Sequence, residues 1–496
     1  MASMDRDSAR IYIIGAGFAG RAIAREIMTK RILGEVVAFL DDDHKKVGTR
    51  IEGIPVLGPI RDVINLVARQ PADEAIIAIP SATREALREL HSLLKKAGFS
   101  RIRIVPTIAQ IIEGDAHLIQ AREIDPQDLL GRNPVNIGLR ESLQYLRGKR
   151  VLITGAGGSI GSELSRQLLS AGVARLYLFG HGENSIYNID RELRLLQEEG
   201  VGEKTSIVPV IGELKDPDYV RFIIARLRCE AIFHAAAYKH VPMMEANPVA
   251  AIENNIIGTR NLVEAALASD TRRFVLISTD KAVEPVSTYG ASKFVAERLV
   301  LDASARSAAG REFMVVRFGN VLGSRGSIVP LFQGQIEKGG PVTVTHPDAT
   351  RYFMTIPEAC SLVLKTGGVG KSGALYLLDM GESVKIRDLA EQMIRFYGYE
   401  PGKDIKIDYI GLRPGERVEE RLFSPEETLV PTEYPRINRL ERKTEPFAID
   451  ALLADVAPVC RFDPAKPKSY RNRLALRAIM KKYVPSLLVP EHESEF

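Results

Sequence analysis

Short apolar runs and helix-forming stretches alternate through the first hundred residues of the chain. The apolar run Ile11–Ile14 precedes a stretch typical of a helix, Ala19–Lys30, and a second apolar run, Val36–Leu40, comes next. Two further runs, Glu74–Ile79 and Ile102–Val105, fit more strands of the same sheet. Runs of this length are typical of buried parallel strands, and strands that alternate with helices build a doubly wound α/β domain.

A glycine motif stands at the first strand-to-helix junction. Gly15, Gly17 and Gly20 follow the first run, and Asp41 ends the second. Such glycines let the backbone approach a pyrophosphate at a helix N-terminus, and the acid accepts a hydrogen bond from a ribose hydroxyl. We therefore predict that residues 1–115 form an N-terminal Rossmann-like domain with a nucleotide site at these four residues. The alternative is a regulatory or interaction module without catalysis.

The alternation begins again at residue 149, after a segment, 116–148, that proline and glycine interrupt and that we interpret as a linker. We predict a second doubly wound parallel-sheet domain over residues 149–423 and a C-terminal extension over 424–496 that serves packing or subunit contact. The fold class is therefore α/β with two Rossmann-like domains. The second series has a helix over Ser162–Ala171 and five strands, Arg150–Ile153, Arg175–Phe179, Ser206–Ile211, Ala231–Ala237 and Phe274–Ser278.

A second glycine motif, Gly155, Gly158 and Gly161, has the spacing of extended short-chain dehydrogenases. Glu213 follows the third strand, where a carboxylate meets the adenine side of a dinucleotide, and the small side chains of Ala235–Ala237 let the backbone lie against it. The residues predicted to bind a nicotinamide dinucleotide are Thr154, Gly155, Gly158, Ser159, Ile160, Gly161, His181, Glu183, Asn184, Glu213, Leu214, Ala235, Ala236, Ala237 and Lys293.

The run Thr279-Asp280-Lys281 directly follows the fifth strand, and Tyr289 and Lys293 come shortly after it. Active sites of open α/β sheets lie at the carboxyl ends of the strands, so we expect the run to lie in the site. Tyr289 and Lys293 are four residues apart and share one face of a helix. Lys293 is expected to hold the nicotinamide ribose and to lower the pKa of Tyr289, which then takes the proton from a sugar hydroxyl.

Asp280 and Lys281 add an acid and a base that a simple oxidoreductase or epimerase does not need. Oxidation of carbon 4 of a hexose acidifies the hydrogen on carbon 5. We expect Lys281 to remove that hydrogen if burial or a cation depresses its pKa, and Asp280, with a raised pKa, to protonate the hydroxyl that leaves carbon 6. Thr279 is expected to bind the oxygen on carbon 4. The alternative for this Asp-Lys pair is a surface ion pair.

Composition narrows the class of protein. The 496 residues are too many for one ordinary domain, and 45% hydrophobic with 26% charged residues is usual for a globular protein. A net charge of +4 gives no support for a nucleic-acid partner. Three widely spaced cysteines predict neither a disulfide framework nor a metal site and fit a reducing cytoplasm. No apolar run is long enough to span a bilayer, and Met1–Arg10 is too polar for a signal peptide.

Together these motifs resemble the nucleoside-diphosphate-sugar 4,6-dehydratases of bacterial capsule, flagellin and glycoprotein sugar biosynthesis, which are extended short-chain dehydrogenases. The resemblance implies a UDP-N-acetylglucosamine substrate, a 4-keto-6-deoxy product and tightly bound NAD(P) that is regenerated in each cycle. It also implies a small C-terminal substrate-binding part and a cytoplasmic homo-oligomer. The segments that carry it are Asp128–Val135, Thr154–Gly161, His234–Pro242, Ser278–Lys281, Arg317–Arg325 and Arg413–Glu416.

The extra N-terminal domain is similar to that of the long members of this family, which retain the configuration at carbon 5, so we expect retention. Many long members have a membrane-spanning region ahead of this domain and a methionine at the active-site tyrosine. This sequence shows no such region and has Tyr289. An inverting dehydratase is therefore the alternative.

The resemblance also implies contacts to the sugar diphosphate. Arg413 would clamp a phosphate and Glu416 would meet a ribose or a base. Members that prefer NAD often have an acid where Gly180 stands. Without that acid a 2′-phosphate is not repelled, so NADP stays as the alternative, and we expect NAD on the resemblance alone. The predicted substrate-binding residues are Lys239, Asn320, Arg325, Arg351, Arg413 and Glu416.

Two other functions fit parts of the pattern. A UDP-sugar 4-epimerase would use Tyr289 and Lys293 but would leave Asp280 and Lys281 without a role. A non-catalytic nucleotide sensor would account for the N-terminal motif but not for the complete set of residues after the fifth strand.

Overall fold

The computed structural model describes residues 9–30, 33–79, 81–105, 122–123, 142–442, 447–490 and 493. The chain divides into two compact units. The first contains Met1–Asn133, Phe332–Val342 and Leu389–Ile407, and the second contains Pro134–Leu331, Thr343–Asp388 and Asp408–Phe496. The domain boundaries inferred from the sequence stay predictions, and the motif 128–135 lies outside the described residues.

The sheet of the first unit is parallel at its centre and has short antiparallel strands at both edges, in the order β3-β4-β2-β1-β5-β6-β7. Helix α1 (Phe18–Lys30) packs on one face through Ile23 and Ile27, whereas α2 (Val63–Arg69) and α3 (Arg84–Lys96) pack on the other. The strands are β1 (Arg10–Ile14), β2 (Glu35–Leu40), β3 (Arg50–Ile51), β4 (Ile54–Gly58), β5 (Glu74–Ile77), β6 (Arg101–Ile104) and β7 (Arg122–Glu123).

The second unit is built on a nine-stranded sheet in the order β10-β9-β8-β11-β12-β13-β17-β21-β20. Strands β8 to β13 and β17 run parallel, and β21 and β20 close one edge antiparallel. The bounds are β8 (Arg150–Thr154), β9 (Arg175–Gly180), β10 (Ser206–Ile211), β11 (Ala231–His234), β12 (Arg273–Thr279), β13 (Glu312–Phe318), β17 (Leu375–Leu378), β20 (Glu427–Pro431) and β21 (Ile437–Arg442).

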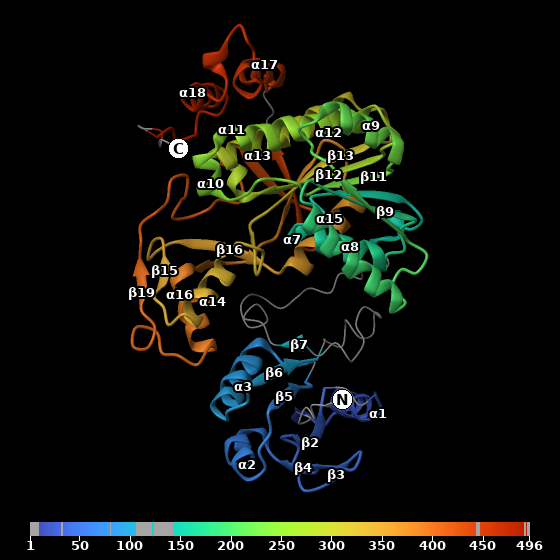
Figure 1. Cartoon of the computed structure of the whole chain (residues 1–496), viewed down its shortest axis with the longest axis vertical. Coiled ribbons are helices and arrows are strands. Elements are labelled where there is room, and N and C mark those ends of the chain that lie inside the picture. The colour runs from blue at the N-terminus through green and yellow to red at the C-terminus, as the bar shows by residue number, and fades with distance from the viewer. Residues whose placement is uncertain are drawn as a thin grey trace, which may run out of the picture. The chain divides into compact units, whose positions relative to one another are not determined.

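Helices cover both faces of this sheet (Figure 1). On one face lie α7 (Ser159–Ser170), α8 (Glu183–Glu198) and α15 (Ile356–Val369), and on the other lie α9 (Pro217–Leu227), α12 (Gly258–Leu267) and α13 (Thr288–Arg306). Because buried side chains project from both faces of each strand, the strands read as continuous apolar runs. The predicted α/β class with two parallel-sheet domains is confirmed.

The C-terminal segment contributes to the sheet and to its helical cover. β20 and β21 both lie within residues 424–496, the segment interpreted from the sequence as an extension. Helices α17 (Ile449–Cys460) and α18 (Arg473–Tyr483) pack on α11 (Pro248–Ala251) and on the outer face of α13 (Figure 1).

Smaller elements surround the carboxyl ends of the main strands. They are α10 (Val241–Ala246), a π-helical turn (Ile252–Ile257), a 3₁₀ turn (Asp280–Ala282), β14 (Asn320–Val321), α14 (Ile328–Glu337), β15 (Val342–Val344), β16 (Thr350–Met354), β18 (Ser383–Lys385), α16 (Ile386–Phe396) and β19 (Ile407–Tyr409). Strands β14, β16 and β18 form one small sheet, and β15 pairs with β19.

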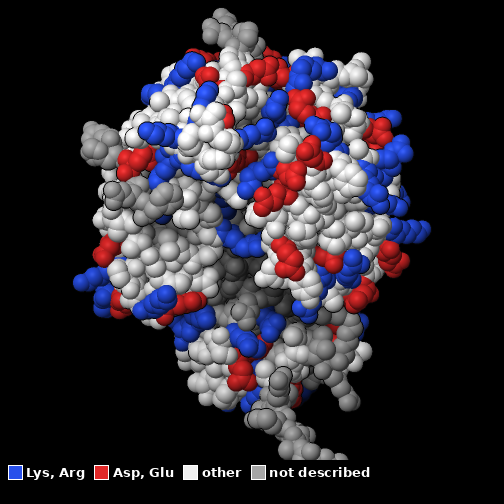
Figure 2. Space-filling model, turned by 45° about the horizontal axis from the view of Figure 1, so that its top comes forward, with Lys and Arg blue, Asp and Glu red and all other residues white. Residues whose placement is uncertain are grey.

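The described helices include none that is both long enough and apolar enough to span a membrane. Over the face drawn in Figure 2, lysine and arginine side chains are interspersed with aspartates and glutamates. This mixture agrees with the small net charge of +4.

Candidate active site

A cavity of about 930 Å³ opens at the carboxyl ends of the parallel strands of the second unit. It is the place where open α/β sheets bind ligands. The predicted site residues that line it are Gly155, Gly158, Ser159, Ile160, Gly161, His181, Glu213, Leu214, Ala235, Ala236, Ala237, Lys239, Thr279, Lys281, Tyr289, Lys293, Asn320, Arg325, Arg351, Arg413 and Glu416. Four predicted residues are not part of its lining, namely Thr154, Glu183, Asn184 and Asp280.

The glycine turn forms one wall of the cavity and leads directly into α7. Gly155 has a φ of +68°, and a Cβ there would lie 2.8 Å from the Cα of Ala236. A Cβ on Gly161 would lie 2.1 Å from the carbonyl oxygen of Gly155. The turn therefore brings bare backbone to the positive N-terminus of a helix, an arrangement that fits the pyrophosphate of a dinucleotide.

Thr154 directly precedes this turn and is held in place by His234. Its Oγ1 lies 2.7 Å from Nδ1 of His234, and both side chains are fully buried. Nε2 of His234 lies 2.9 Å from Oγ1 of Thr259. Burial lowers the pKa of His234 to about 3, so the imidazole is neutral and joins two hydroxyl groups. Thr154 is therefore a structural residue of the turn.

At the adenine end the predicted acid has a partner. Glu213 Oε2 lies 3.1 Å from Nζ of Lys215, and both line the cavity. The His181 ring packs edge-on against Tyr238, with the ring centroids 6.1 Å apart. Glu183 lies in the first turn of α8, outside the lining.

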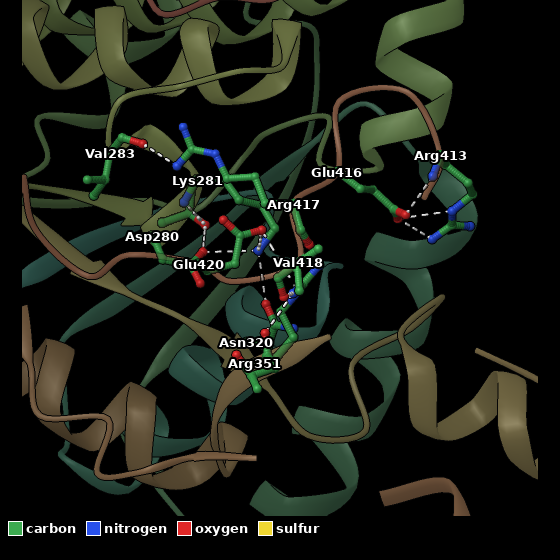
Figure 3. A network of polar contacts seen from close by, with 12 residues as sticks. Asp280, Lys281, Val283, Asn320, Arg351, Arg413, Glu416, Arg417, Val418 and Glu420 are labelled. Atoms are coloured by element: carbon green, nitrogen blue, oxygen red, sulfur yellow. Dashed lines mark hydrogen bonds and ion pairs between the residues drawn. The ribbon is translucent and has the colours of Figure 1, made fainter. Parts of the chain in front are cut away.

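The residues predicted to be catalytic, Thr279, Asp280 and Lys281, lie where β12 ends. Asp280 is fully buried, and its Oδ1 accepts hydrogen bonds from Thr279 Oγ1 at 2.9 Å and from Lys281 Nζ at 3.0 Å. The same Nζ donates to Asn320 Oδ1 at 3.1 Å and lies 3.7 Å from Glu420 Oε1 (Figure 3). Asp280 and Lys281 thus form a buried pair at the carboxyl end of β12, and the alternative of a surface ion pair is wrong.

The pKa of Lys281 is shifted in the opposite direction to the one expected from the sequence. Burial lowers this pKa, but the carboxylates of Asp280 and Glu420 raise it by more, and the net effect is a pKa above its ordinary value. Arg351 opposes the two carboxylates in part. The expectation had rested on burial or a nearby cation, and Glu420 was not identified from the sequence.

Tyr289 and Lys293 lie one turn apart near the start of α13, and both are buried. Lys293 Nζ donates to the backbone oxygen of Ile277 at 2.8 Å, and burial lowers its pKa to about 8. Burial raises the pKa of Tyr289 to about 12. The cation that opposes this rise is Lys281, whereas Lys293 was expected from the sequence to act on Tyr289.

Three predicted substrate residues are held by other parts of the chain. Arg325 donates to the backbone oxygen of Gly157, and its backbone N–H donates to Ser159 Oγ at 3.0 Å, so it contacts the glycine turn. Arg413 and Glu416 contact each other, with 2.5 Å between Nη2 and Oε1 (Figure 3). All of them still line the cavity.

Arg351 is bound to the segment that carries Glu420. Its guanidinium donates to the backbone oxygens of Arg417 at 2.7 Å and Val418 at 2.9 Å, and its Nε lies 3.9 Å from Glu420 Oε1. Arg417 in turn donates to the backbone oxygens of Val283 and Glu284, just beyond the catalytic run. Arg417 and Glu420 were not predicted from the sequence. The only signal was their position directly after the Arg413–Glu416 motif.

A second buried network lies behind the cavity. Arg317 is 2% exposed and bonds both oxygens of Glu297, at 3.1 and 2.8 Å, and both oxygens of Glu427, at 2.9 and 3.2 Å. Glu297 also accepts a hydrogen bond from Ser278 Oγ at 2.6 Å. This network joins β12, α13, β13 and β20, and so fixes the catalytic helix relative to the strand that delivers Asp280.

The predicted nucleotide site of the first unit has a different geometry. Gly15 has a φ of +102°, and a Cβ on Gly20 would lie 1.9 Å from the carbonyl oxygen of Gly15, whereas a Cβ on Gly17 would meet nothing within 4 Å. Asp41 Oδ2 accepts from the backbone N–H of Ala16 at 2.7 Å and from Lys46 Nζ at 3.1 Å. The carboxylate expected to bind a ribose is therefore engaged within the chain.

Comparison with known proteins defines the family. The family described as "Polysaccharide biosynthesis protein" matches residues 151–442, which contain the whole cavity lining described above. This chain belongs to the polysaccharide biosynthesis protein family. A second family, described as "CoA-binding domain", matches residues 3–106. The family resemblance inferred from the motifs is confirmed.

Relatives within and around the polysaccharide biosynthesis protein family have several names. The "Probable polysaccharide biosynthesis protein EpsC" of Bacillus subtilis (strain 168) is 43% identical over 87% of this chain and 71% of its own length. The "UDP-N-acetylglucosamine 4,6-dehydratase (inverting)" of Campylobacter jejuni subsp. jejuni (strain 81-176) is 31% identical over 62% of this chain and 88% of its own. A "UDP-glucose 4-epimerase" of Rickettsia canadensis (strain McKiel) is 32% identical over 56% and 79%.

Among solved structures, the X-ray structure of Pen from Bacillus thuringiensis has the same fold as the catalytic unit of this family member. It aligns with a TM-score of 0.55 and 32% identity over 60% of this chain and 91% of its own. The similarity supports the Rossmann-like fold of the parallel-sheet unit.

Proposed function

We propose that this protein is a UDP-N-acetylglucosamine 4,6-dehydratase that retains the configuration at carbon 5 and serves bacterial polysaccharide or glycoprotein sugar synthesis. The observation that carries the proposal is the meeting of Thr279, Lys281, Tyr289 and Lys293 in one cavity with a glycine turn. Relatives of this chain include a UDP-N-acetylglucosamine 4,6-dehydratase and a polysaccharide biosynthesis protein, which supports the substrate class.

The glycine turn, the helix N-terminus and the small residues Ala235–Ala237 fit a nicotinamide dinucleotide, and we propose NAD with NADP as the alternative. When bound, this group would accept a hydride from the sugar and return it later. Lys293 would hold its ribose, as the position of Nζ beside the carboxyl end of β12 suggests. Tyr289 would take the proton of the carbon-4 hydroxyl while the carbon–hydrogen bond at carbon 4 breaks.

Lys281 and Asp280 would carry out the elimination. A single proton shift between Lys281 Nζ and Asp280 Oδ1, 3.0 Å apart, converts the ion pair into a neutral amine and a carboxylic acid. The amine then takes the proton from carbon 5, and the acid protonates the oxygen on carbon 6, which leaves as water. The hydride adds to carbon 6, and the ammonium returns a proton to carbon 5. Tyr289, which took the carbon-4 proton as a tyrosinate, then passes that proton to Lys281, so every residue returns to its starting state and the net change is the loss of one water molecule.

The first test is proton NMR of the protein incubated with UDP-N-acetylglucosamine in heavy water. We expect a 4-keto-6-deoxy sugar nucleotide with deuterium on carbon 5, and coupling constants that correspond to retention. Coupling constants of the inverted sugar would keep the dehydratase but overturn retention. The absence of dehydration of any UDP-hexose, with NAD or NADP added, would overturn the proposal.

The rival function is a UDP-sugar 4-epimerase, because a relative named "UDP-glucose 4-epimerase" is 32% identical over 56% of this chain. Replacing Lys281 with Met separates the two. A dehydratase should lose roughly 10²–10⁴-fold in rate, the usual contribution of a general base, whereas an epimerase needs no base at carbon 5 and should lose only the smaller contribution that the charge of Lys281 makes to the pKa of Tyr289. Methionine is similar in length to lysine, so the variant should fold. Its thermal unfolding midpoint checks this.

A further inference from the structure

Lys281 contacts a second carboxylate that the proposed chemistry does not use. Oε1 of Glu420 lies 3.7 Å from Lys281 Nζ, and the Glu420 side chain is only 5% exposed. Asp280 reaches the same Nζ from the turn after β12 and Asn320 from β14, whereas Glu420 approaches from the separate segment after Glu416 (Figure 3). The position of Glu420 is therefore independent of the catalytic run.

The carboxylate of Glu420 is fixed on its other side by a cation. Arg351 Nε lies 3.9 Å from Glu420 Oε1, and its remaining N–H groups bond the backbone oxygens of Arg417 and Val418. Arg351 comes from β16, which the main sheet supports through β14 and the segment after β13. Arg351 therefore holds both the backbone and the side chain of the Glu420 segment.

Asp280, Lys281, Glu420 and Arg351 are thus charges of alternating sign in one buried group. Two carboxylates stabilise the Lys281 ammonium, and Arg351 offsets part of their effect. Because water is largely excluded, each charge acts more strongly than it would at the surface. The other titratable groups facing Lys281 are Tyr289 on α13 and Lys239 beyond β11. Protonated Tyr289 is neutral and protonated Lys239 is a cation, so neither adds a negative charge beside Lys281.

We propose that Glu420 is a positioning residue that controls the protonation state of Lys281 and, through it, the pH at which the carbon-5 proton is removed. This inference rests on the proposed dehydratase function for its role in the reaction. Before elimination Glu420 restricts the amine form of Lys281. After Lys281 has accepted the carbon-5 proton, Glu420 stabilises the ammonium until that proton returns to the sugar.

The sign of the effect is set by the charges. Glu420→Gln removes a negative charge beside the ammonium and leaves Arg351 unopposed, so the pKa of Lys281 falls. In the proposed mechanism the reactive amine and acid share one proton, and in this variant the pair loses that proton at lower pH, so the descending limb of the kcat profile moves toward acid. The neighbouring Glu419 is exposed and supplies a matched control, since Glu419→Gln removes the same charge one residue away.

The experiment measures Lys281 directly as well as turnover. The full chain is labelled with a trace of acetic anhydride between pH 7 and 10.5, and acetylation of Lys281 is followed by mass spectrometry. At a given pH we expect faster labelling in Glu420→Gln than in the wild type, by about tenfold for each unit by which the pKa falls. The kcat limb should move by the same amount, with Glu419→Gln matching the wild type in both.

Each outcome decides one question. If labelling and the kcat limb of Glu420→Gln match the wild type, or if kcat falls equally at every pH, the role assigned to Glu420 is wrong. If labelling shifts while no UDP-sugar is dehydrated, the electrostatic control stands and the proposed function is wrong. Should Glu420→Gln not fold, Glu420→Asp gives the readout, because it keeps the charge and withdraws it by one methylene. We expect from it a smaller shift in the same direction.

Discussion

The two units contain the same strand–turn–helix motif, yet their surroundings differ. In both, the last glycine of the motif packs against the carbonyl oxygen of the first, so that a Cβ would lie 1.9 Å away at Gly20 and 2.1 Å away at Gly161. In the first unit Asp41 bonds the turn directly. In the second unit Gly180 ends the corresponding strand, and the turn borders the cavity.

The difference teaches that the glycine motif reports how a helix packs on a strand, and that chemistry depends on the side chains at the ends of the other strands. After β12 the second unit has an acid and a base in contact with each other, and a buried tyrosine lines the same cavity as the base. In the first unit, by contrast, the central strands β1, β2, β5 and β6 end in Ile14, Leu40, Ile77 and Ile104. We therefore expect the reaction in the second unit, and four experiments test that division.

The largest effect should come from matched tyrosine substitutions. Tyr289→Phe removes the proposed proton acceptor, so kcat should fall by roughly 10²–10⁴-fold, the usual worth of general-base catalysis. Tyr12→Phe in the first unit removes a buried hydroxyl that donates to the backbone oxygen of Gln70 at 2.6 Å, and kcat should not change. Steady-state kinetics measures both. Equal losses in the two variants would contradict the division of labour.

The second largest effect should come from removing a buried charge, which should lower the free energy of unfolding more in the second unit than in the first. Arg317→Met leaves Glu297 and Glu427 without their shared cation, and should lower the free energy of unfolding by about 3–5 kcal/mol. Arg101 in the first unit pairs with Glu74, but its side chain is 58% exposed, so Arg101→Met should cost only about 0–1 kcal/mol. Urea unfolding gives the comparison. Similar costs would mean that the Arg317 network is not the main tie between helix and sheet.

The pH dependence of the free energy of unfolding should report the titration of the buried Lys293. The pKa of Lys293 is lowered to about 8 in the folded protein, from the ordinary lysine value of 10.5. Between these values the folded state binds fewer protons than the unfolded state, so stability should rise with pH between about 8 and 10, by up to about 3 kcal/mol. Lys293→Met should abolish this rise in unfolding experiments. A rise that persists in the variant would have to come from another group.

Glycine substitutions should give the smallest and most similar effects. Gly20→Ala and Gly161→Ala each force a Cβ against backbone, and each should lower the free energy of unfolding by roughly 1–3 kcal/mol. Only Gly161→Ala alters the cavity wall, so only it should raise the KM of the dinucleotide. Calorimetry and kinetics on the two variants test this. A raised KM in Gly20→Ala would indicate that the first turn also serves the reaction.

The sequence predicted the central strands well because fully buried strands read as continuous apolar runs. The observed bounds of β1, β8 and β10 agree with expectation within one residue. It missed the β3–β4 hairpin, whose turn places Glu52 and Gly53 at positive φ of 52° and 81° without the usual Asn-Gly signal. It also missed β20 and β21, because edge strands carry polar residues and lose the apolar pattern.

The candidate site shows the same limit. Thr279, Asp280 and Lys281 could be found because they are consecutive, and Tyr289 and Lys293 because helical spacing links them. Glu420 and Glu427 reach the site or its support only through the fold, from segments far along the chain. No local pattern places these charges beside the site. The role of Lys281 as a base was therefore tied to a depressed pKa, whereas the fold raises that pKa.

The contacts of the C-terminal segment have a consequence for the order in which the protein matures during synthesis. Glu427 on β20 completes the Arg317 network from 110 residues downstream, and Arg477 on α18 bonds Glu245, whose carboxylate caps the start of α13 at the N–H of Thr288. A ribosome makes Glu427 and Arg477 well after the residues that they contact. The nascent chain would therefore contain Thr279, Asp280 and Lys281 for many seconds before α13 is anchored, since elongation proceeds at about 5–20 residues per second. Catalytic competence would be gained only after the segments with Glu427 and Arg477 have been made.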